Sequence, residues 1–142
     1  MTTVYVGCAL TFASQAYRDS ITALKSLLRE RGYEVLEFLD MTKGTCHDVW
    51  VQDMKVCVAN CKILLAVGDF ASTGLGIEIG LAIGRHKTPV LIVAQDELLV
   101  TRAIQDPDEE NVWFKRYTDL LTDVPRLLDE TVRDLKARHI LT

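Results

Sequence analysis

Residues 72–80 read STGLGIEIG and lie between two apolar runs, residues 62–67 and residues 81–84. This order predicts a strand, a tight loop and then a helix. Ser72 is a suitable first cap of that helix, because its hydroxyl can accept a hydrogen bond from a backbone N–H of the first turn. Gly74 and Gly76 allow a ligand to approach the backbone closely and leave N–H groups free to bind an anion.

Two acidic side chains lie on helical faces that are otherwise uncharged. Glu78 stands about one turn inside the helix that follows Ser72, and Asp53 stands in a helix predicted over residues 47–61. The residues three and four positions away are Gly74, Leu75, Leu81 and Ala82 for Glu78, and Val49, Trp50, Val56 and Cys57 for Asp53. Carboxylates are rarely buried without a partner or a purpose. Each acid could instead pair with a buried arginine or cap a neighbouring loop.

Both helices flank the strand predicted at residues 62–67, so Asp53 and Glu78 could reach one pocket. Two carboxylates in one pocket are the usual equipment for cleaving a glycosidic bond. One carboxylate attacks the anomeric carbon or stabilises its cationic transition state, and the other moves protons or orients the substrate. Burial and mutual repulsion tend to raise the pKa of one member of such a pair.

Composition excludes several other classes of protein. The chain has 142 residues with a net charge of −4, which suits one domain and argues against a general surface for nucleic acid or anionic membranes. We find no signal peptide and no apolar run of membrane-spanning length. The four cysteines are expected to be reduced thiols of a cytoplasmic protein. Cys57 and Cys61 lack C-x-x-C spacing, so we predict no metal site and no cofactor.

Strand and helix patterns alternate along the whole chain, which predicts an α/β fold. Strands are expected at residues 3–10, 33–39, 62–67, 88–94 and 112–117; helices are expected at residues 16–31, 47–61, from 72 to about 86, at 118–139 and, as a short turn, within 96–105. We predict a flavodoxin-like, Rossmann-like parallel five-stranded sheet in the order 2-1-3-4-5, with helices on both faces. A ligand would bind beyond the carboxyl ends of strands one and three, at loops 10–15 and 70–76.

At Tyr5, Asp53 and residues 72–80 the sequence resembles the nucleoside 2-deoxyribosyltransferases and their nucleotide-hydrolysing relatives. The nearest pattern is that of the 2′-deoxynucleoside 5′-monophosphate N-glycosidases, in which the turn reads much like Ser-x-Gly-x-Gly-x-Glu-x-Gly. The resemblance implies a single domain of this kind over residues 1–142. It also implies that Glu78 is the nucleophile on C1′, that Asp53 is its polar partner at the sugar and base, and that Tyr5 lines the sugar pocket.

The resemblance also implies where a phosphate would bind. The transferases usually carry Asp at the position of Ser72, and serine instead tolerates a 5′-phosphate beside Gly74 and Gly76 at the helix N-terminus. The loop after the first strand would contribute Gly7, Ala9 and Thr11.

This loop departs from the hydrolase pattern Gly-Ser-Ile-Arg, because it reads Cys-Ala-Leu-Thr at residues 8–11. Arg18 is the candidate that could fold back in place of the missing arginine, and a solvated helix charge is the alternative. The family also borrows a hydroxyl residue from a neighbouring subunit, for which Thr101 is the candidate.

Together these features predict an N-glycosidase that hydrolyses a (deoxy)nucleoside 5′-monophosphate to free base and sugar phosphate, as a homodimer or larger homo-oligomer. The one partner expected is a small nucleotide. A transferase that exchanges bases and a nucleotide-binding module without turnover are the alternatives. A cytokinin-type phosphoribohydrolase is less favoured, because its P-G-G-x-G-T-x-x-E signature is absent.

Overall fold

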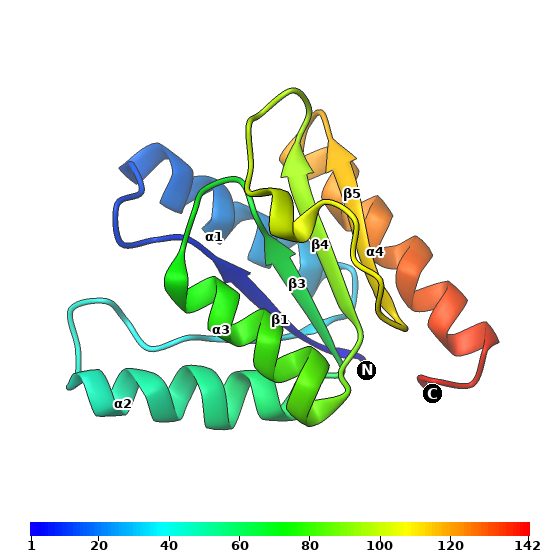
Figure 1. The fold of residues 1–142 in the computed structure, drawn as a ribbon, viewed down its shortest axis with the longest axis horizontal. Coiled ribbons are helices and arrows are strands. Elements are labelled where there is room, and N and C mark those ends of the chain that lie inside the picture. The colour runs from blue at the N-terminus through cyan, green and yellow to red at the C-terminus, as the bar shows by residue number, and fades with distance from the viewer.

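Five parallel strands form one sheet in the order β2-β1-β3-β4-β5 (Figure 1). The computed structural model describes all residues, 1–142. The strands are β1 (Thr3–Cys8), β2 (Glu34–Leu36), β3 (Ile63–Val67), β4 (Val90–Gln95) and β5 (Val112–Tyr117). The predicted α/β fold and strand order are therefore confirmed.

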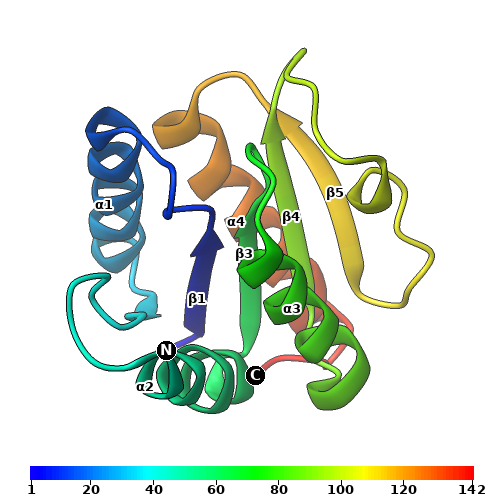
Figure 2. The ribbon, with the colours of Figure 1, turned by 60° about the vertical axis from the view of Figure 1, so that its left-hand side comes forward.

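Helices cover both faces of this sheet. They are α1 (Gln15–Glu30), α2 (Cys46–Trp50) with a π-helical continuation (Val51–Val58), α3 (Thr73–Leu81) with a π-helical continuation (Ala82–His86), a 3-10 turn (Arg102–Ile104) and α4 (Leu120–Ala137). Figures 1 and 2 show α1 and α4 on one face, and α2 and α3 on the other. No helix is both long and apolar enough to cross a membrane.

Each face of the sheet has its own hydrophobic core. Successive residues of a strand point to opposite faces, so Val4 and Val6 join the core under α1 and α4, whereas Tyr5 joins the core under α2 and α3. The central strands β3 and β4 are buried on both faces, as is usual in parallel sheets. The face that carries Tyr5 is the one on which both predicted acids lie.

The predicted cap of the central helix is confirmed. The Ser72 hydroxyl accepts a hydrogen bond from the Leu75 N–H at 3.2 Å, and α3 starts at the next residue, Thr73. The loop after β3 therefore ends in a fixed geometry at the carboxyl edge of the sheet.

Three predicted elements differ from the observed ones. The second strand ends at Leu36 rather than residue 39, because the Glu37 carbonyl accepts hydrogen bonds from Gln52 and Cys57 instead of continuing the sheet. The helix predicted at residues 47–61 is π-helical over most of its length. The helix predicted within residues 96–105 is confined to the three residues of the 3-10 turn.

Candidate active site

Two adjoining cavities lie where the chain leaves the carboxyl ends of the neighbouring strands β1 and β3. Beyond these ends the chain turns to α1 on one face and to α3 on the other, which makes this the switch point at which open α/β sheets bind ligands. The first, here called the acid cavity, has a volume of about 400 Å³ and the second, the loop cavity, about 540 Å³. Thr11, Ser72 and Gly74 line both.

The acid cavity brings together the three residues that were predicted to act on the sugar. Its lining comprises Tyr5, Cys8, Leu10, Thr11, Phe38, Leu39, Met41, Val49, Asp53, Met54, Ser72, Gly74, Leu75 and Glu78. Tyr5 comes from β1, Asp53 from the π-helical segment after α2, and Glu78 from α3. π-Helical segments are rare and are frequently found at functional sites. The geometric expectation that both acids face one cavity therefore holds, and the roles of these residues remain predictions.

Glu78 is the buried acid with a carboxylate oxygen that has no partner. It is 5% exposed, and its Oε2 atom has no hydrogen-bond partner in the protein. Asp69 is equally buried, but its carboxylate accepts hydrogen bonds from the Gln95 N–H and the Tyr117 hydroxyl. Leaving a buried carboxylate oxygen unpaired costs free energy. The hydrogen bonds of Asp69 avoid this cost, whereas the environment of Glu78 does not. Asp69 joins the ends of strands, whereas Glu78 is free to act on a ligand.

The surroundings of Glu78 keep its proton unusually tightly bound. Burial raises the pKa of Glu78, the hydrogen-bonding influence of the Tyr5 phenol lowers it, and the charge of Asp53 raises it, with a result of about 7. Burial and then the nearby charges of Glu78 and Asp53 raise the pKa of Tyr5 above its ordinary range. The Tyr5 hydroxyl therefore stays protonated and available as a donor beside the two acids.

Asp53 is half-buried and only partly satisfied. Its Oδ1 atom accepts a hydrogen bond from the Leu39 N–H at 3.2 Å, so it helps to hold the segment after β2. Burial raises its pKa, which the Leu39 hydrogen bond and the charge of Lys25 oppose. Neither Asp53 nor Glu78 forms an ion pair with the protein. The alternative in which a buried arginine neutralises either acid is therefore not observed.

The start of α3 offers free backbone donors to the cavities. The N–H groups of Thr73 and Gly74 have no acceptor in the protein, and both residues line the loop cavity. The positive end of the helix dipole adds to their attraction for an anion. Gly76, which was predicted to join this turn, is exposed and lines neither cavity, and a Cβ there would meet no other atom.

The loop after β1 contributes fewer groups than predicted. Ala9 lines the loop cavity and Thr11 lines both, but Gly7 lines neither. A Cβ at Gly7 would lie 2.9 Å from Leu75 Cδ1 and 3.5 Å from Glu78 Oε2, so this glycine allows α3 to pack closely on β1. Its place is behind Glu78 rather than against a substrate.

Arg18 and Thr101 also lie outside both cavities. Arg18 does fold back, but its Nη2 atom donates to the Leu10 carbonyl at 3.0 Å and so holds the loop from behind. Its Nε atom is buried without a hydrogen-bond partner, so Arg18 is not a freely solvated charge, and its contact with a ligand remains a prediction. Thr101 is exposed and precedes the 3-10 turn.

Several lining residues were not identified from the sequence. Phe12 and Phe70 line the loop cavity, and Phe38 and Met41 line the acid cavity. Phe12 lies within the predicted ligand loop at residues 10–15, and Phe70 is the first residue of the loop at 70–76. Their positions in these loops could have identified them as lining residues. Phe38 was assigned to a strand that ends earlier in the structure.

The cysteines do not form a metal cluster in this structure. No three His, Cys, Asp or Glu side chains are grouped so that they could hold a metal ion. Cys57 and Cys61 are buried in the core under α2 and α3. Cys8 lines the acid cavity, and burial raises its pKa to about 12, so that it remains a thiol near neutral pH.

No protein-family model and no curated protein sequence matches the chain. Among solved structures it is similar to the CMP N-glycosidase BcmB of Clostridium botulinum, with 21% sequence identity and a TM-score of 0.69, over 91% of this chain and 98% of that one. The chain shares its fold with an N-glycosidase. A lysine decarboxylase of Francisella novicida, LdcF, is also similar, with 11% identity and a TM-score of 0.54, but the match covers 94% of this chain and only 17% of that one. At these identities the likeness establishes the fold.

We predict that Gly7→Ala disturbs the packing of the Leu75 side chain between α3 and β1. The added Cβ would come within 2.9 Å of Leu75, so the free energy of unfolding should fall by about 1–3 kcal/mol, as for other overpacked cores. Denaturant unfolding measures this. Gly84→Ala is the matched control, because a Cβ there meets no other atom, and it should not destabilise the protein. Equal stability of the Gly7→Ala variant and the parent would contradict the close packing.

We predict that Glu78 makes the stability of the protein depend on pH. Its pKa rises from 4.5 to about 7 on folding, so the native state loses stability as the pH rises between these values, and the loss is complete above pH 7. Glu78→Gln should therefore stabilise the protein by up to about 3 kcal/mol at pH 8 and by little at pH 4. Thermal and urea unfolding at both pH values measure this difference. A Glu78→Gln effect that is the same at pH 4 and pH 8 would show that the carboxylate is not strained by burial.

Proposed function

We propose that the protein is an N-glycosidase that hydrolyses the N-glycosidic bond of a (deoxy)nucleoside 5′-monophosphate, releasing the free base and the sugar 5-phosphate. The observation that carries this proposal is the buried, unpaired carboxylate of Glu78 in one cavity with Asp53 and Tyr5. The volume of about 400 Å³ is suitable for a small ligand. The fold shared with a CMP N-glycosidase supports the same reaction class.

The two acids divide the reaction between them. The ionised Glu78 attacks C1′, the electron pair of the C1′–N bond passes to the departing base, and a glycosyl ester forms on Glu78. Asp53 orients the nucleotide and passes a proton to the departing base. Water then attacks C1′, its proton returns to Asp53, and the ester bond to Glu78 breaks. The Tyr5 hydroxyl donates toward the carboxylates and positions the sugar. The steps balance without a cofactor.

The 5′-phosphate is placed at the start of α3. The free N–H groups of Thr73 and Gly74, with the helix dipole, provide donors for it, and the Ser72 side chain adds no negative charge there. A phosphate at this position sets the sugar toward Glu78, one helical turn further along the same helix. Position and orientation of the substrate are thus fixed by the same element that carries the nucleophile.

We expect Glu78→Gln to abolish base release. Its amide cannot attack C1′, so kcat/KM should fall by about 10³-fold or more, and Asp53→Asn should lower it by about 10²-fold or more. The measurement is chromatography of free base after incubation with a panel of deoxy- and ribonucleoside 5′-monophosphates. Glu130→Gln, an exposed acid on α4 far along the chain, should behave like the parent.

The same assay separates the alternatives. Adding a second free base should yield no exchanged nucleoside, whereas formation of that product would indicate a 2-deoxyribosyltransferase. Thermal stabilisation by nucleotides without any free base would indicate a binding module. Base release that is equal in Glu78→Gln and the parent would remove the proposed mechanism.

We also propose that the protein assembles as a homodimer or larger homo-oligomer. Trp50, Val56 and Ile77 are between 37% and 43% exposed on α2, its π-helical continuation and α3, which pack side by side (Figure 1). Thr101 lines neither the acid cavity nor the loop cavity of its own chain, so a role at the site would require a second copy. The molar mass from light scattering should be a multiple of the 15.9 kDa of one chain. Ile77→Glu should lower this mass, because it places a charge on the exposed apolar surface. A mass of 15.9 kDa at all protein concentrations would contradict this.

A further inference from the structure

The loop cavity continues from the acid cavity past the residues that would hold the phosphate. Thr11, Ser72 and Gly74 line both cavities, and the remaining lining of the loop cavity comes from loop residues beyond them. Its volume of about 540 Å³ exceeds that of the acid cavity and falls in the range of small-molecule sites. A phosphate group alone leaves most of this space unfilled. The space lies on the side of the phosphate that faces away from Glu78.

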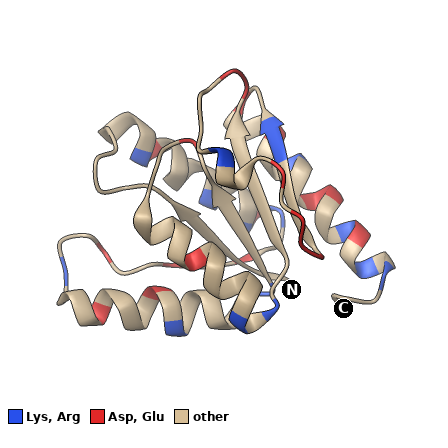
Figure 3. Cartoon of the chain, viewed as in Figure 1, with Lys and Arg blue, Asp and Glu red and all other residues tan.

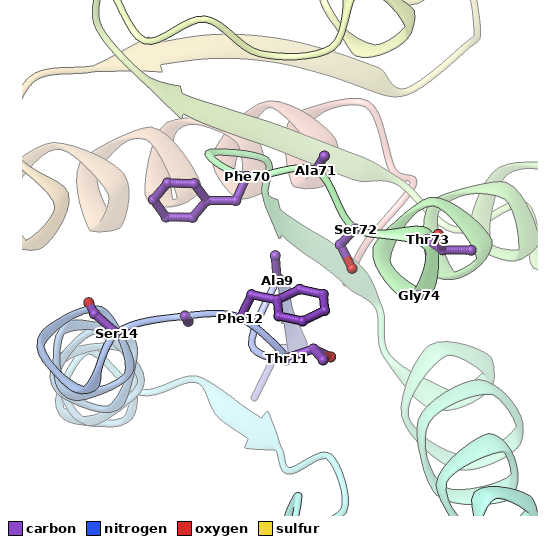
Figure 4. A pocket seen from close by; sticks show the side chains of 10 residues that line it. Ala9, Thr11, Phe12, Ser14, Phe70, Ala71, Ser72, Thr73 and Gly74 are labelled. Carbon is purple, nitrogen blue, oxygen red and sulfur yellow. The ribbon is translucent and has the colours of Figure 1, made fainter.

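Two exposed aromatic rings line this additional space. Phe12 is 99% exposed and Phe70 is 49% exposed, and they come from the loops after β1 and β3. Figure 4 shows both rings in the gap between these two loops, with Phe12 on the side of Ser72. The Phe70 ring packs edge-on against Tyr17, with 5.0 Å between the ring centroids and 81° between their planes. One ring is therefore held in place and the other is free to adjust, an arrangement that suits the stacking of a flat ring.

The charges around the two cavities favour a ligand whose phosphate group is esterified. No Lys, Arg or His lines either cavity, and Figure 3 shows no blue segment on the loop after β1 or on the first turns of α3. The Arg18 guanidinium donates to the Leu10 carbonyl of this loop and lines neither cavity. A phosphate monoester carries a charge of about −1.5 to −2 at pH 7 and would lie near Asp53 and Glu78. A phosphodiester carries a single negative charge and is repelled less.

We propose that the loop cavity binds an aromatic group that is esterified to the 5′-phosphate, as in a second nucleoside. The preferred substrates are then nucleotide phosphodiesters, with the scissile nucleoside in the acid cavity and the second ring between Phe12 and Phe70. This inference rests on the proposed N-glycosidase function, keeps its reaction, and shifts the preferred substrate from the 5′-monophosphate to an ester of that phosphate.

The test compares three compounds with the same base and sugar: the 5′-monophosphate, its methyl phosphodiester and its phenyl phosphodiester, in series for the four common bases. The methyl and phenyl esters have equal charge, so the ratio of their kcat/KM values reports ring binding. The monophosphate can carry a second negative charge that the methyl ester lacks, so the ratio of their kcat/KM values reports the effect of that charge. We expect base release from the phenyl ester to exceed that from the methyl ester by about ten-fold, and release from the methyl ester to exceed that from the monophosphate.

Variants of Phe12 assign the effect to the ring. Phe12→Ala should bring the phenyl-to-methyl ratio close to one, and Phe12→Tyr should preserve it. Leu99→Ala is the matched control, because Leu99 is 94% exposed on the loop after β4 and lines neither cavity. This control should leave all rates unchanged.

The outcomes separate this inference from the function on which it rests. A monophosphate that is hydrolysed faster than both diesters, or a Phe12→Ala variant with an unchanged ratio, would overturn the phosphodiester preference and leave the N-glycosidase proposal standing. Absence of base release from every compound would remove the N-glycosidase proposal. Calorimetry with the phenyl and methyl esters then decides the ring site, and equal Kd values would overturn it.

Discussion

The site depends on a carboxylate that the fold buries and does not neutralise. Glu78 is as inaccessible as Asp69, yet both Asp69 oxygens accept hydrogen bonds, whereas Glu78 Oε2 has no partner. The arrangement persists because the surrounding packing fixes it: α3 packs closely on β1, with the side chains of Leu75 and Glu78 against Gly7. Stability is given up locally, and in return a reactive group is held in place before any ligand arrives.

Topology brings the other groups to this carboxylate. β1 and β3 are neighbours, and the chain leaves them in opposite directions, so one loop and one helix start converge at the same edge of the sheet. Tyr5 reaches the site from the strand itself, since its side chain points to the α2 and α3 face. Asp53 approaches from the π-helical segment and is held by the backbone of Leu39. Four separate segments therefore build one cavity.

The parts of this arrangement that follow local rules could be predicted from the sequence. The strand order follows from the alternation of elements, the start of α3 from the capping chemistry of Ser72, and the shared cavity of Asp53 and Glu78 from the absence of charge around each on its helix. Contacts between distant segments could not be predicted. The early end of β2 results from side chains of a later helix that bond the Glu37 carbonyl. The hydrogen bond from Arg18 to the Leu10 carbonyl is a further contact that no local pattern in the sequence predicts.

The division of labour between chain segments has an evolutionary consequence. The chemical groups of the acid cavity are anchored on a strand and on helical segments, whereas the loop cavity is lined by residues 9–14 and 70–74, which are almost entirely connecting segments. Connecting segments tolerate replacement and insertion far better than the elements they join. Descendants of this scaffold can therefore change the ligand group that the loop cavity accepts by remodelling two short turns, while the acidic residues of the neighbouring cavity are inherited intact.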